Sequence, residues 1–496
     1  MATMAMHMMT TSLPRMSSSS VTPPNTVSPA PSVLPVRAIP GSYGLPLVGP
    51  FVDRLDYFWF QSQETFFRKR SEKYKSTVFR TNIPPTFPFF TGVNPHVIAV
   101  LDCKSFSHLF DLDLVEKKNS LIGHFMPSLS FTGDIRVGVY LDPSEPQHSQ
   151  VKNFSLDILK RSSSVWIPEF ISNLDVMWTT VEEDLSKNGS SNVLVPLQKC
   201  IFRFFTKIIA GADTANSSDI ADKGFGYLDS WLALQIIPTQ KIGVLQPLEE
   251  IFLHSFAYPS ILVSSGYQKL YDFLKKEGKE VIQRGETEFG LSEKETIHNL
   301  LFILGFNAFG GFSVFLPGLI TRLGSTDETE LQNKLRKEVR EKSGSTQQLS
   351  FESVREMELV QSFVYEALRY SPPVPCQYAR ARKDFKLTSY DASYEIKKGE
   401  LLCGYQVLAM RDPKVFDDPE SFKADRFTGE KGRELLKYLY WSNGPQTGSP
   451  SASNKQCAAK DAVILTACIF VADLLRRYDS FTCSSSLSVT AVEKSK

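Results

Sequence analysis

The sequence has few cysteines, and no two of them form a C-x-x-C pair. The seven are scattered along 496 residues, at Cys103, Cys200, Cys376, Cys403, Cys457, Cys468 and Cys483. An odd number without paired spacing argues against a disulfide framework and against a zinc site. We therefore expect a reducing compartment, in which one or a few thiols carry chemistry and the others pack as small hydrophobic side chains.

An excess of either charge is also missing. The formal net charge is +1, and no block of the chain is rich in Lys and Arg. Such a protein has no field with which to recruit nucleic acid or an acidic partner. The hydrophobic fraction is 42%, and 36 phenylalanines make the chain rich in aromatic residues. A chain of this length and composition can bury a large core and still enclose an apolar pocket.

The first fifty residues contain no Asp or Glu and are rich in Ser, Thr, Pro and Met. This composition is typical of an organellar transit peptide, and a plain disordered tail is the alternative. A secretory signal is not expected, because no apolar core segment is present. We predict a transit-like disordered leader over residues 1–35 and a single large domain over residues 36–496, because no low-complexity linker divides the chain after Phe51.

Residues 296–321 contain no charged side chain. The run is long enough to cross a membrane. Because Asn299, Asn307 and Pro317 lie within it, we predict a buried central helix instead, and we expect no integral membrane anchor. Helical spacing of apolar residues recurs elsewhere, and two segments favour strands. The sequence therefore predicts a mainly α fold with small β-sheets, with helices over 58–73, 150–160, 166–187 and 328–342 and strands over 95–102 and 385–396.

Three motifs follow one another in the last third of the chain. Glu366 and Arg369 lie one turn apart on a predicted helix, an arrangement that alone indicates no more than an exposed ion pair. Arg426 lies in a D-R-F loop that is uninformative by itself. A polar loop rich in Gly and Pro then ends at Cys457, directly before a long helix. A helix N-terminus stabilises a thiolate, the form that binds haem iron, although most cysteines are simply buried and inert.

The order and spacing of these motifs resembles the cytochrome P-450 superfamily over nearly the whole chain after the leader. The resemblance implies that superfamily's haem-thiolate fold, with a haem b between a long central helix and the cysteine loop. It implies that Cys457 is the iron ligand. The uncharged run at 296–321 falls where the central helix belongs. A buried, structural ion-pair network is implied for Glu366, Arg369 and Arg426.

Two departures from the usual superfamily pattern narrow the resemblance. The central run reads GFNAFGGFS and lacks the acid–Thr pair that protonates iron-bound oxygen, so the proton relay for O₂ activation is missing. The cysteine loop is long, has Lys455 two residues before the cysteine, and has Ala459 where Gly is usual. Both features, with the motifs NGPQT and FN.FGG, resemble a plant branch that acts on fatty-acid hydroperoxides. Its members are allene oxide synthases, hydroperoxide lyases and divinyl ether synthases.

The branch implies a reaction that needs neither O₂ nor a reductase, because the O–O bond is brought by the substrate. Iron cleaves that bond homolytically, and the resulting alkoxy radical closes to an epoxide beside a carbon radical. Loss of an electron and a proton gives an allene oxide. Return of hydroxyl gives a hemiacetal, which falls apart into an aldehyde and an oxo-acid.

Three positions bear on this choice. The resemblance places Asn307 over the haem, where it steers the hydroperoxide by hydrogen bonding; the alternative is a helix Asn bonded to a nearby carbonyl. Allene oxide synthases typically have Phe at the position of Leu121 and Ser at the position of Ala308. Leu has no π-system to stabilise the radical, so both positions favour the lyase, unless they serve only core packing.

The haem propionates and the substrate carboxylate require cations. Lys455 is a candidate for a propionate as a point charge, and of the neighbouring pair Lys117 and Lys118 we expect Lys118 to serve the other propionate. Solvated surface lysines are the alternative.

The sequence therefore predicts a plant fatty-acid hydroperoxide lyase that cleaves 13-hydroperoxides of linoleic and linolenic acid into a C6 aldehyde and a C12 oxo-acid. Allene oxide synthase or divinyl ether synthase on the same substrates is the alternative. A general monooxygenase and a haem carrier without turnover are weaker hypotheses. We expect chloroplast location, no nucleic-acid partner, and peripheral association with a plastid membrane such as the envelope.

Overall fold

The computed structural model describes residues 34–86, 90, 92–243, 245–343 and 348–495. The predicted leader, residues 1–35, therefore lies almost wholly outside the described residues. The boundary at residue 36 stays a prediction.

Helices make up most of the described chain, as predicted. Short 3₁₀ turns and two π-helical segments, η1 (Asp56–Phe60) and η8 (Ile303–Gly310), join or interrupt them. The α-helices are α2 (Val48–Leu55), α3 (Gln63–Tyr74), α4 (Cys103–Phe106), α5 (Pro146–Ser162), α6 (Trp166–Asn188), α7 (Leu194–Ala210), α8 (Ser218–Ile236), α9 (Gln246–Phe252), α10 (Ser264–Glu277), α11 (Lys279–Phe289), α12 (Glu293–Phe302), α13 (Gly311–Gly324), α14 (Thr329–Ser343), α15 (Phe351–Arg355), α16 (Glu358–Tyr370), α17 (Gln406–Ala409), α18 (Gly429–Leu435) and α19 (Lys460–Arg477).

The strands form three small sheets in the described residues, with orders β2-β3-β9-β6-β4, β1-β8-β7 and β10-β11-β5. In the largest sheet only β3 and β9 run parallel. The bounds are β1 (Val36–Arg37), β2 (Val78–Asn82), β3 (His96–Val100), β4 (Val115–Glu116), β5 (Ser191–Asn192), β6 (Cys376–Ala381), β7 (Phe385–Thr388), β8 (Ser393–Ile396), β9 (Leu401–Tyr405), β10 (Tyr478–Cys483) and β11 (Ser488–Lys494).

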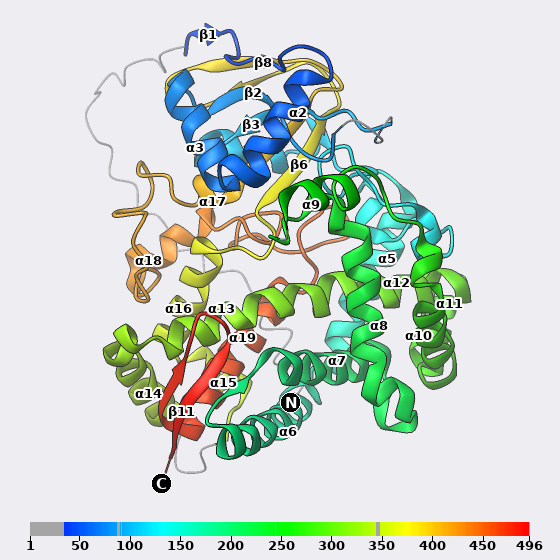
Figure 1. The fold of residues 1–496 in the computed structure, drawn as a ribbon, viewed down its shortest axis with the longest axis vertical. Helices are drawn as coiled ribbons and strands as arrows, with labels where there is room; N and C mark the ends of the chain where they lie inside the picture. The colour runs from blue at the N-terminus through cyan, green and yellow to red at the C-terminus, as the bar shows by residue number, and fades with distance from the viewer. Residues whose placement is uncertain (1–33, 87–89, 91, 244, 344–347, 496) are drawn as a thin grey trace, which may run out of the picture.

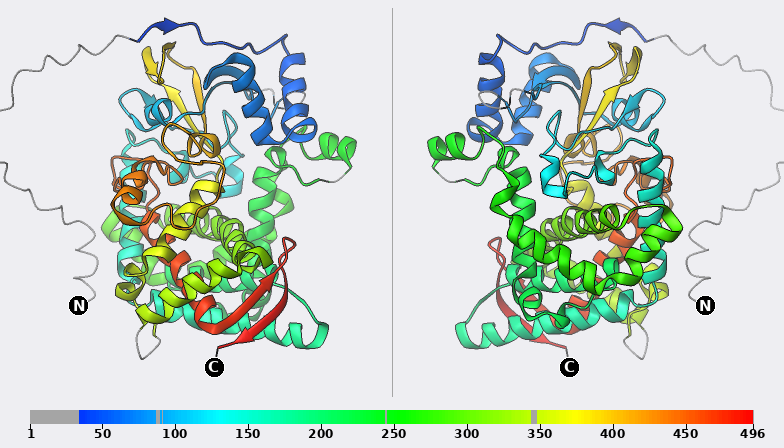
Figure 2. Two further views of the ribbon diagram at one scale, coloured as in Figure 1. Left: turned by 90° about the vertical axis from the view of Figure 1, so that its left-hand side faces the viewer. Right: turned by 90° about the vertical axis from the view of Figure 1, so that its right-hand side faces the viewer.

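Two lobes result from this arrangement. The first two sheets, α2 and α3 lie at one end of the molecule, and the helices gather at the other (Figures 1 and 2). The described residues form two buried apolar clusters. The larger runs through the helices and reaches one face of the sheets, and the smaller lies between α3 and the five-stranded sheet. The predicted helices and strands are confirmed with two differences. Gln61 and Ser62 break the first helix into η1 and α3, and the segment 385–396 forms two antiparallel strands, β7 and β8, joined by a turn.

The central helix runs through the middle of the molecule as α12, η8 and α13 (Figure 1). By length and composition alone, Glu293–Gly324 could cross a membrane, but more than half of its most apolar window is buried in the protein. Leu300, Leu304 and Leu316 are almost fully buried. The prediction of a buried helix is therefore confirmed.

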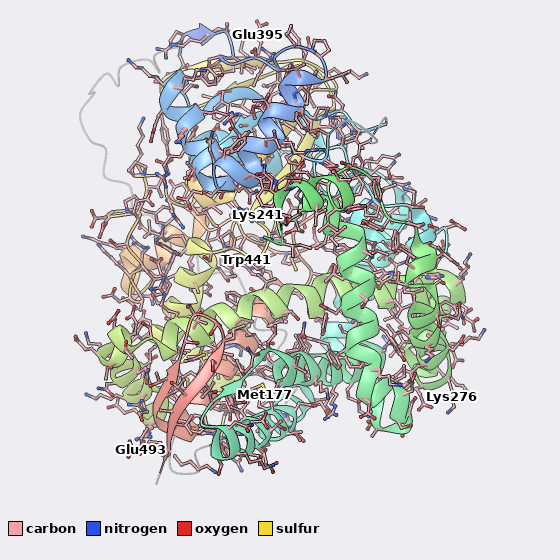
Figure 3. The ribbon with its side chains drawn as sticks, in the orientation of Figure 1. Met177, Lys241, Lys276, Glu395, Trp441 and Glu493 are labelled. Carbon is pink, nitrogen blue, oxygen red and sulfur yellow. The ribbon has the colours of Figure 1, made fainter. Side chains whose placement is uncertain are left out.

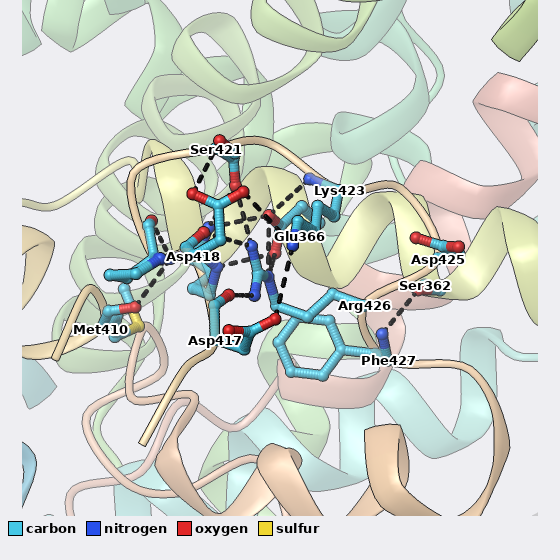
Figure 4. Close-up of polar contacts among 12 residues, drawn as sticks. Ser362, Glu366, Met410, Asp417, Asp418, Ser421, Lys423, Asp425, Arg426 and Phe427 are labelled. Carbon is cyan, nitrogen blue, oxygen red and sulfur yellow. Dashed lines mark hydrogen bonds and ion pairs between the residues drawn. The ribbon is translucent and has the colours of Figure 1, made fainter. Parts of the chain in front are cut away.

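The network predicted for the E-x-x-R motif is also confirmed. Arg369 donates to both carboxylate oxygens of Glu366 at 2.7 and 2.8 Å, and both side chains are fully buried. Arg426 reaches the same carboxylate at 3.0 Å. The remaining N–H groups of both arginines bond backbone carbonyls of the loop between residues 410 and 421 (Figure 4). Every charge here has partners, so the network fixes the loop that leads to the cysteine segment.

Candidate active site

A cavity of about 400 Å³ lies between the central helix and the cysteine loop. Its walls come from α5, η8, α13, the start of β6 and the loop before α19. Figure 3 labels one wall residue, Trp441, in the middle of the molecule. Aromatic side chains cover the central-helix side, at Phe302, Phe306, Phe312 and Phe315. A mostly apolar, aromatic wall with a few polar groups is the usual character of a ligand site.

The cysteine loop closes on itself and presents Cys457 to this cavity. The Cys457 amide donates to the carbonyl of Ser442 at 2.8 Å. Gln456 fills the centre of the loop, where its amide donates to the Pro445 carbonyl at 2.6 Å and to the Ser442 hydroxyl at 3.2 Å. Asn443 donates to the Lys455 carbonyl at 3.0 Å. These bonds position the thiol without the usual glycine after it.

The electrostatics of Cys457 differ from the expectation. Burial raises the pKa of the thiol, against the opposing effects of the Lys152 ammonium and the Ala459 amide. The helix α19 begins only at Lys460. The expected stabilisation of the thiolate by the helix end is therefore outweighed by desolvation, and a metal cation is needed to hold the charged form.

Three lysines line the cavity: the buried Lys117 and the partly buried Lys152 and Lys455. Burial lowers the pKa of Lys117 and of Lys455 to about 7, and it also lowers the pKa of Lys152. None of the three lies within 4 Å of a carboxylate in the part of the chain that the structure describes. The buried ammonium groups bond only neutral oxygens, such as the amide of Asn443 for Lys117.

These features fit a haem. Two carboxylates brought into the cavity by a porphyrin would supply the missing counter-charges of the lysines, and the Cys457 sulfur faces the same space. No cluster of three or more His, Cys, Asp or Glu side chains that could hold a metal ion occurs among the described residues. The donor set therefore points to a prosthetic group with its own nitrogen ligands.

The structure brings only part of the predicted cation set to the cavity. Lys455 lines it, and its ammonium donates to the carbonyls of Gly138, Val139 and Leu141 at 2.8–3.1 Å. Lys118 does not line the cavity. Its side chain is 42% exposed and its ammonium lies 3.4 Å from Glu145.

The neighbouring Lys117 takes the inner position, because successive residues after β4 point to opposite sides. Its backbone amide is fixed by Asp142 at 2.8 Å. Lys152 was not predicted; its only signal in the sequence is its place one turn after His148 on a helix that faces the cysteine loop.

Asn307 lies in the π-helical segment η8 and is exposed toward the cavity. Its side chain has no hydrogen-bond partner among the described residues, so the alternative of a bond to a helix carbonyl is not observed. A π-helical insertion in a long helix is often found at functional sites, because it re-aims side chains. Here it leaves a free amide over the space that Cys457 faces.

The two positions expected to set the product lie in different surroundings. Leu121 lines the cavity, and its amide donates to the Phe125 carbonyl at 3.1 Å. Ala308 is buried in the helical core with 8% exposure and does not line the cavity. Any effect of Ala308 must therefore act through the packing of η8. Gln377 and Trp441 are wall residues that the sequence gave no reason to select.

Comparison with known proteins agrees with this geometry. The Cytochrome P450 family profile matches residues 326–447, which contain the ion-pair network and end within the cysteine loop, before Cys457.

Three relatives span nearly the whole chain. A fatty acid hydroperoxide lyase of Solanum lycopersicum is 65% identical over 94% of this chain and 98% of its own. A linolenate hydroperoxide lyase of Arabidopsis thaliana is 60% identical over 97% of each. An allene oxide synthase of Arabidopsis thaliana is 43% identical over 90% of this chain and 86% of its own. The chain therefore belongs to the cytochrome P450 family, in the group that contains the fatty-acid and linolenate hydroperoxide lyases.

Proposed function

We propose that the protein is a chloroplast fatty-acid hydroperoxide lyase that cleaves 13-hydroperoxides of linoleic and linolenic acid into a C6 aldehyde and a C12 oxo-acid. The observation that carries the proposal is the free amide of Asn307, which faces the same cavity as the partly buried Cys457. The lyase is favoured over the allene oxide synthase because the lyase relatives are 60–65% identical and the synthase 43%. Leu121 on the cavity wall favours the same choice.

The cofactor is haem b. Covalent haem attachment uses a C-x-x-C-H motif, and the sequence has none. Cys457 would bind the iron, and Lys117, Lys152 and Lys455 would pair with the propionates. When bound, the haem supplies the one-electron chemistry that opens the peroxide O–O bond. Lys118 instead forms a surface ion pair with Glu145.

The protein's own groups direct the outcome. Asn307 holds the hydroperoxide by hydrogen bonds and keeps its oxygen near the carbon that must receive it. Leu121 offers no π face to the substrate radical, so return of hydroxyl is faster than loss of an electron. The phenylalanines of the central helix exclude water, which protects the radical from side reactions.

The reaction requires no reductase and no O₂. The peroxide bond arrives in the substrate, and Ile303–Gly310 of the central helix carries no titratable side chain that could relay protons to bound oxygen.

Peripheral membrane association is supported by an apolar patch formed by α2, η1 and the segment around α9. The two parts are locked together by an ion pair of 2.7 Å between Arg54 and Glu250. The patch consists of Leu45, Leu47, Val48, Phe51, Val52, Phe60, Ile242, Leu245, Leu248, Ile251, Phe252, Ile261 and Leu262, which are 40–72% exposed. Patches of this kind mark contact surfaces, and a lipid surface fits an enzyme of lipid substrates.

Flotation with plastid-lipid vesicles tests the membrane association. The double variant Leu245→Ser/Leu248→Ser is expected to lower the fraction of protein bound to the vesicles, and equal binding by this variant would contradict the association.

The activity is tested with purified, haem-loaded protein and 13-hydroperoxy-linolenate, without reductant, with products identified by gas chromatography–mass spectrometry. We expect a C6 aldehyde and a C12 oxo-acid from the wild type and none from Cys457→Ser. Ketols and cyclopentenones would instead identify an allene oxide synthase. Untouched substrate would refute the proposal.

A further inference from the structure

A second cavity adjoins the active-site cavity and opens to the surface. It encloses about 950 Å³ between the C-terminal half of α13, the end of α16 and the β10–β11 hairpin. Phe315 lines both cavities, and Pro372 of the outer one is followed by Pro373 of the inner one. The two spaces therefore border each other at the Phe315 side chain and at the backbone of Pro372 and Pro373. We call the second space the outer cleft.

One face of the central helix lines both spaces in succession. Asn307, Gly311 and Phe315 line the inner cavity, and Phe315, Gly318 and Arg322 line the outer cleft. Steps of three and four residues keep side chains on one face of a helix. A chain-like molecule lying along this face would pass from Asn307, over Phe315, to the guanidinium of Arg322.

Arg322 is held mainly by stacking on aromatic rings, with one long ion pair to Glu328. Its guanidinium stacks on the ring of Phe422 at 4.4 Å, with Tyr370 at 5.8 Å. The nearest carboxylate, that of Glu328, lies at 3.5 Å, which is the outer limit of a hydrogen bond. No other hydrogen-bond partner of this side chain is found in the described ranges. A planar guanidinium fixed by stacking, with free N–H groups at the edge of a cleft, is suited to bidentate recognition of a carboxylate.

The hairpin is fixed against the same end of the helix. A side chain at Gly324 would lie 2.6 Å from the backbone nitrogen of Cys483, so only glycine permits this contact. The contact places the hydroxyl groups of Ser484 and Ser485 on the wall of the outer cleft. Figure 1 shows the hairpin beside this end of the central helix. The cleft thus has an apolar floor toward the active site and a polar lining that includes Arg322 and the ion pair between Arg411 and Glu64.

The spacing matches the substrate. Asn307 and Arg322 are 15 residues apart, or about 22 Å along the helix. An extended fatty-acid chain from its carboxyl carbon to C13 spans twelve bonds, roughly 15 Å, and a hydrogen bond of about 3 Å at each end extends its reach to about 21 Å. A carboxylate at Arg322 therefore places carbon 13 near Asn307.

We propose that the outer cleft is the subsite for the carboxylate end of the fatty-acid hydroperoxide, with Arg322 as its binding residue. The inference rests on the proposed function and deepens it. The chain threads past Phe315, so the anchor at Arg322 sets which carbon lies under Asn307. The free acid is the preferred substrate, and an ester, which has no charge, gains nothing from the guanidinium.

The test compares 13-hydroperoxy-linolenate with its methyl ester in haem-loaded wild type, Arg322→Gln, Arg322→Lys and Glu328→Gln. Arg322→Gln should raise KM for the acid about tenfold or more, leave kcat within twofold, and leave both constants for the ester unchanged. Arg322→Lys should lie between. Glu328→Gln is the matched control, because it removes the same ion pair and keeps the guanidinium; KM for the acid should not rise.

Two outcomes overturn the subsite: acid and ester affected equally by Arg322→Gln, or the acid not affected at all. A binding measurement separates this from a failure of the proposed function. The unreactive 13-hydroxy-linolenate, followed by the haem absorbance change, should bind Arg322→Gln about tenfold more weakly than wild type, whatever products the enzyme forms. Equal dissociation constants would contradict the subsite even if the lyase activity is observed.

Discussion

Two groups of charged side chains in this protein differ in whether the chain itself supplies their counter-charges. In the E-x-x-R network, each arginine meets the Glu366 carboxylate and several carbonyls. In the active-site cavity, the buried Lys117 and the partly buried Lys455 meet no carboxylate among the described residues. The first group is complete within the chain and stabilises the fold. The second has no counter-charge within the described chain, which supports the proposal that a bound cofactor brings the anions.

The largest expected effect comes from breaking the complete group. Glu366→Gln leaves two arginines buried without a counter-charge and should lower the free energy of unfolding by about 3–5 kcal/mol, a large share of a typical total. Denaturant titration of the haem-loaded protein measures this. Glu358→Gln on the same helix is the control, because its ion pair with Arg433 is exposed, and it should cost less than about 1 kcal/mol. Equal losses of unfolding free energy in the two variants would show that the network stabilises the fold no more than an exposed ion pair does.

The incomplete group predicts an unusual pH dependence of the haem-free protein. The pKa of Lys117 and of Lys455 is lowered from 10.5 to about 7 in the folded state. Between those values the unfolded chain binds more protons than the folded one, so stability should rise with pH, by up to about 1.4 kcal/mol per pH unit for each lysine. Lys117→Met should lower the slope of the unfolding free energy against pH by the contribution of one lysine, which is up to about 1.4 kcal/mol per pH unit. Slopes that are the same for wild type and variant would argue against a depressed pKa.

How much of this contrast could be predicted from the sequence depends on how local each feature is. The buried central helix follows from composition, whereas the buried E-x-x-R network follows from the family resemblance, because its spacing alone indicates only an exposed ion pair. The choice of Lys117 over Lys118 does not, because two adjacent lysines differ only by the direction in which the chain leaves β4. The raised pKa of Cys457 depends on burial from distant elements. The free amide of Asn307 depends on a π-helical insertion that no sequence pattern predicted.

A small change inside the cavity should alter the product and little else. Leu121→Phe adds a ring to the cavity wall, which can stabilise the substrate radical and favour its oxidation. We expect a larger share of allene oxide, detected as ketols by gas chromatography–mass spectrometry, with a change in unfolding free energy below about 1.5 kcal/mol. Ala308→Ser is the companion variant in the core. An unchanged product ratio in Leu121→Phe would show that the side chain at position 121 does not set the product.

The lysines of the cavity have no carboxylate partner in the described chain, and we expect the propionates of a haem to supply one. The most direct measurement is an equilibrium titration of haem into haem-free wild type and Lys117→Met, followed by absorbance, with unfolding of both haem-free proteins measured alongside. We predict that Lys117→Met weakens haem binding about tenfold and leaves the haem-free protein as stable or more stable, because a buried, unpaired ammonium is removed. Unchanged haem affinity, or a haem-free variant that is clearly less stable, would contradict the claim.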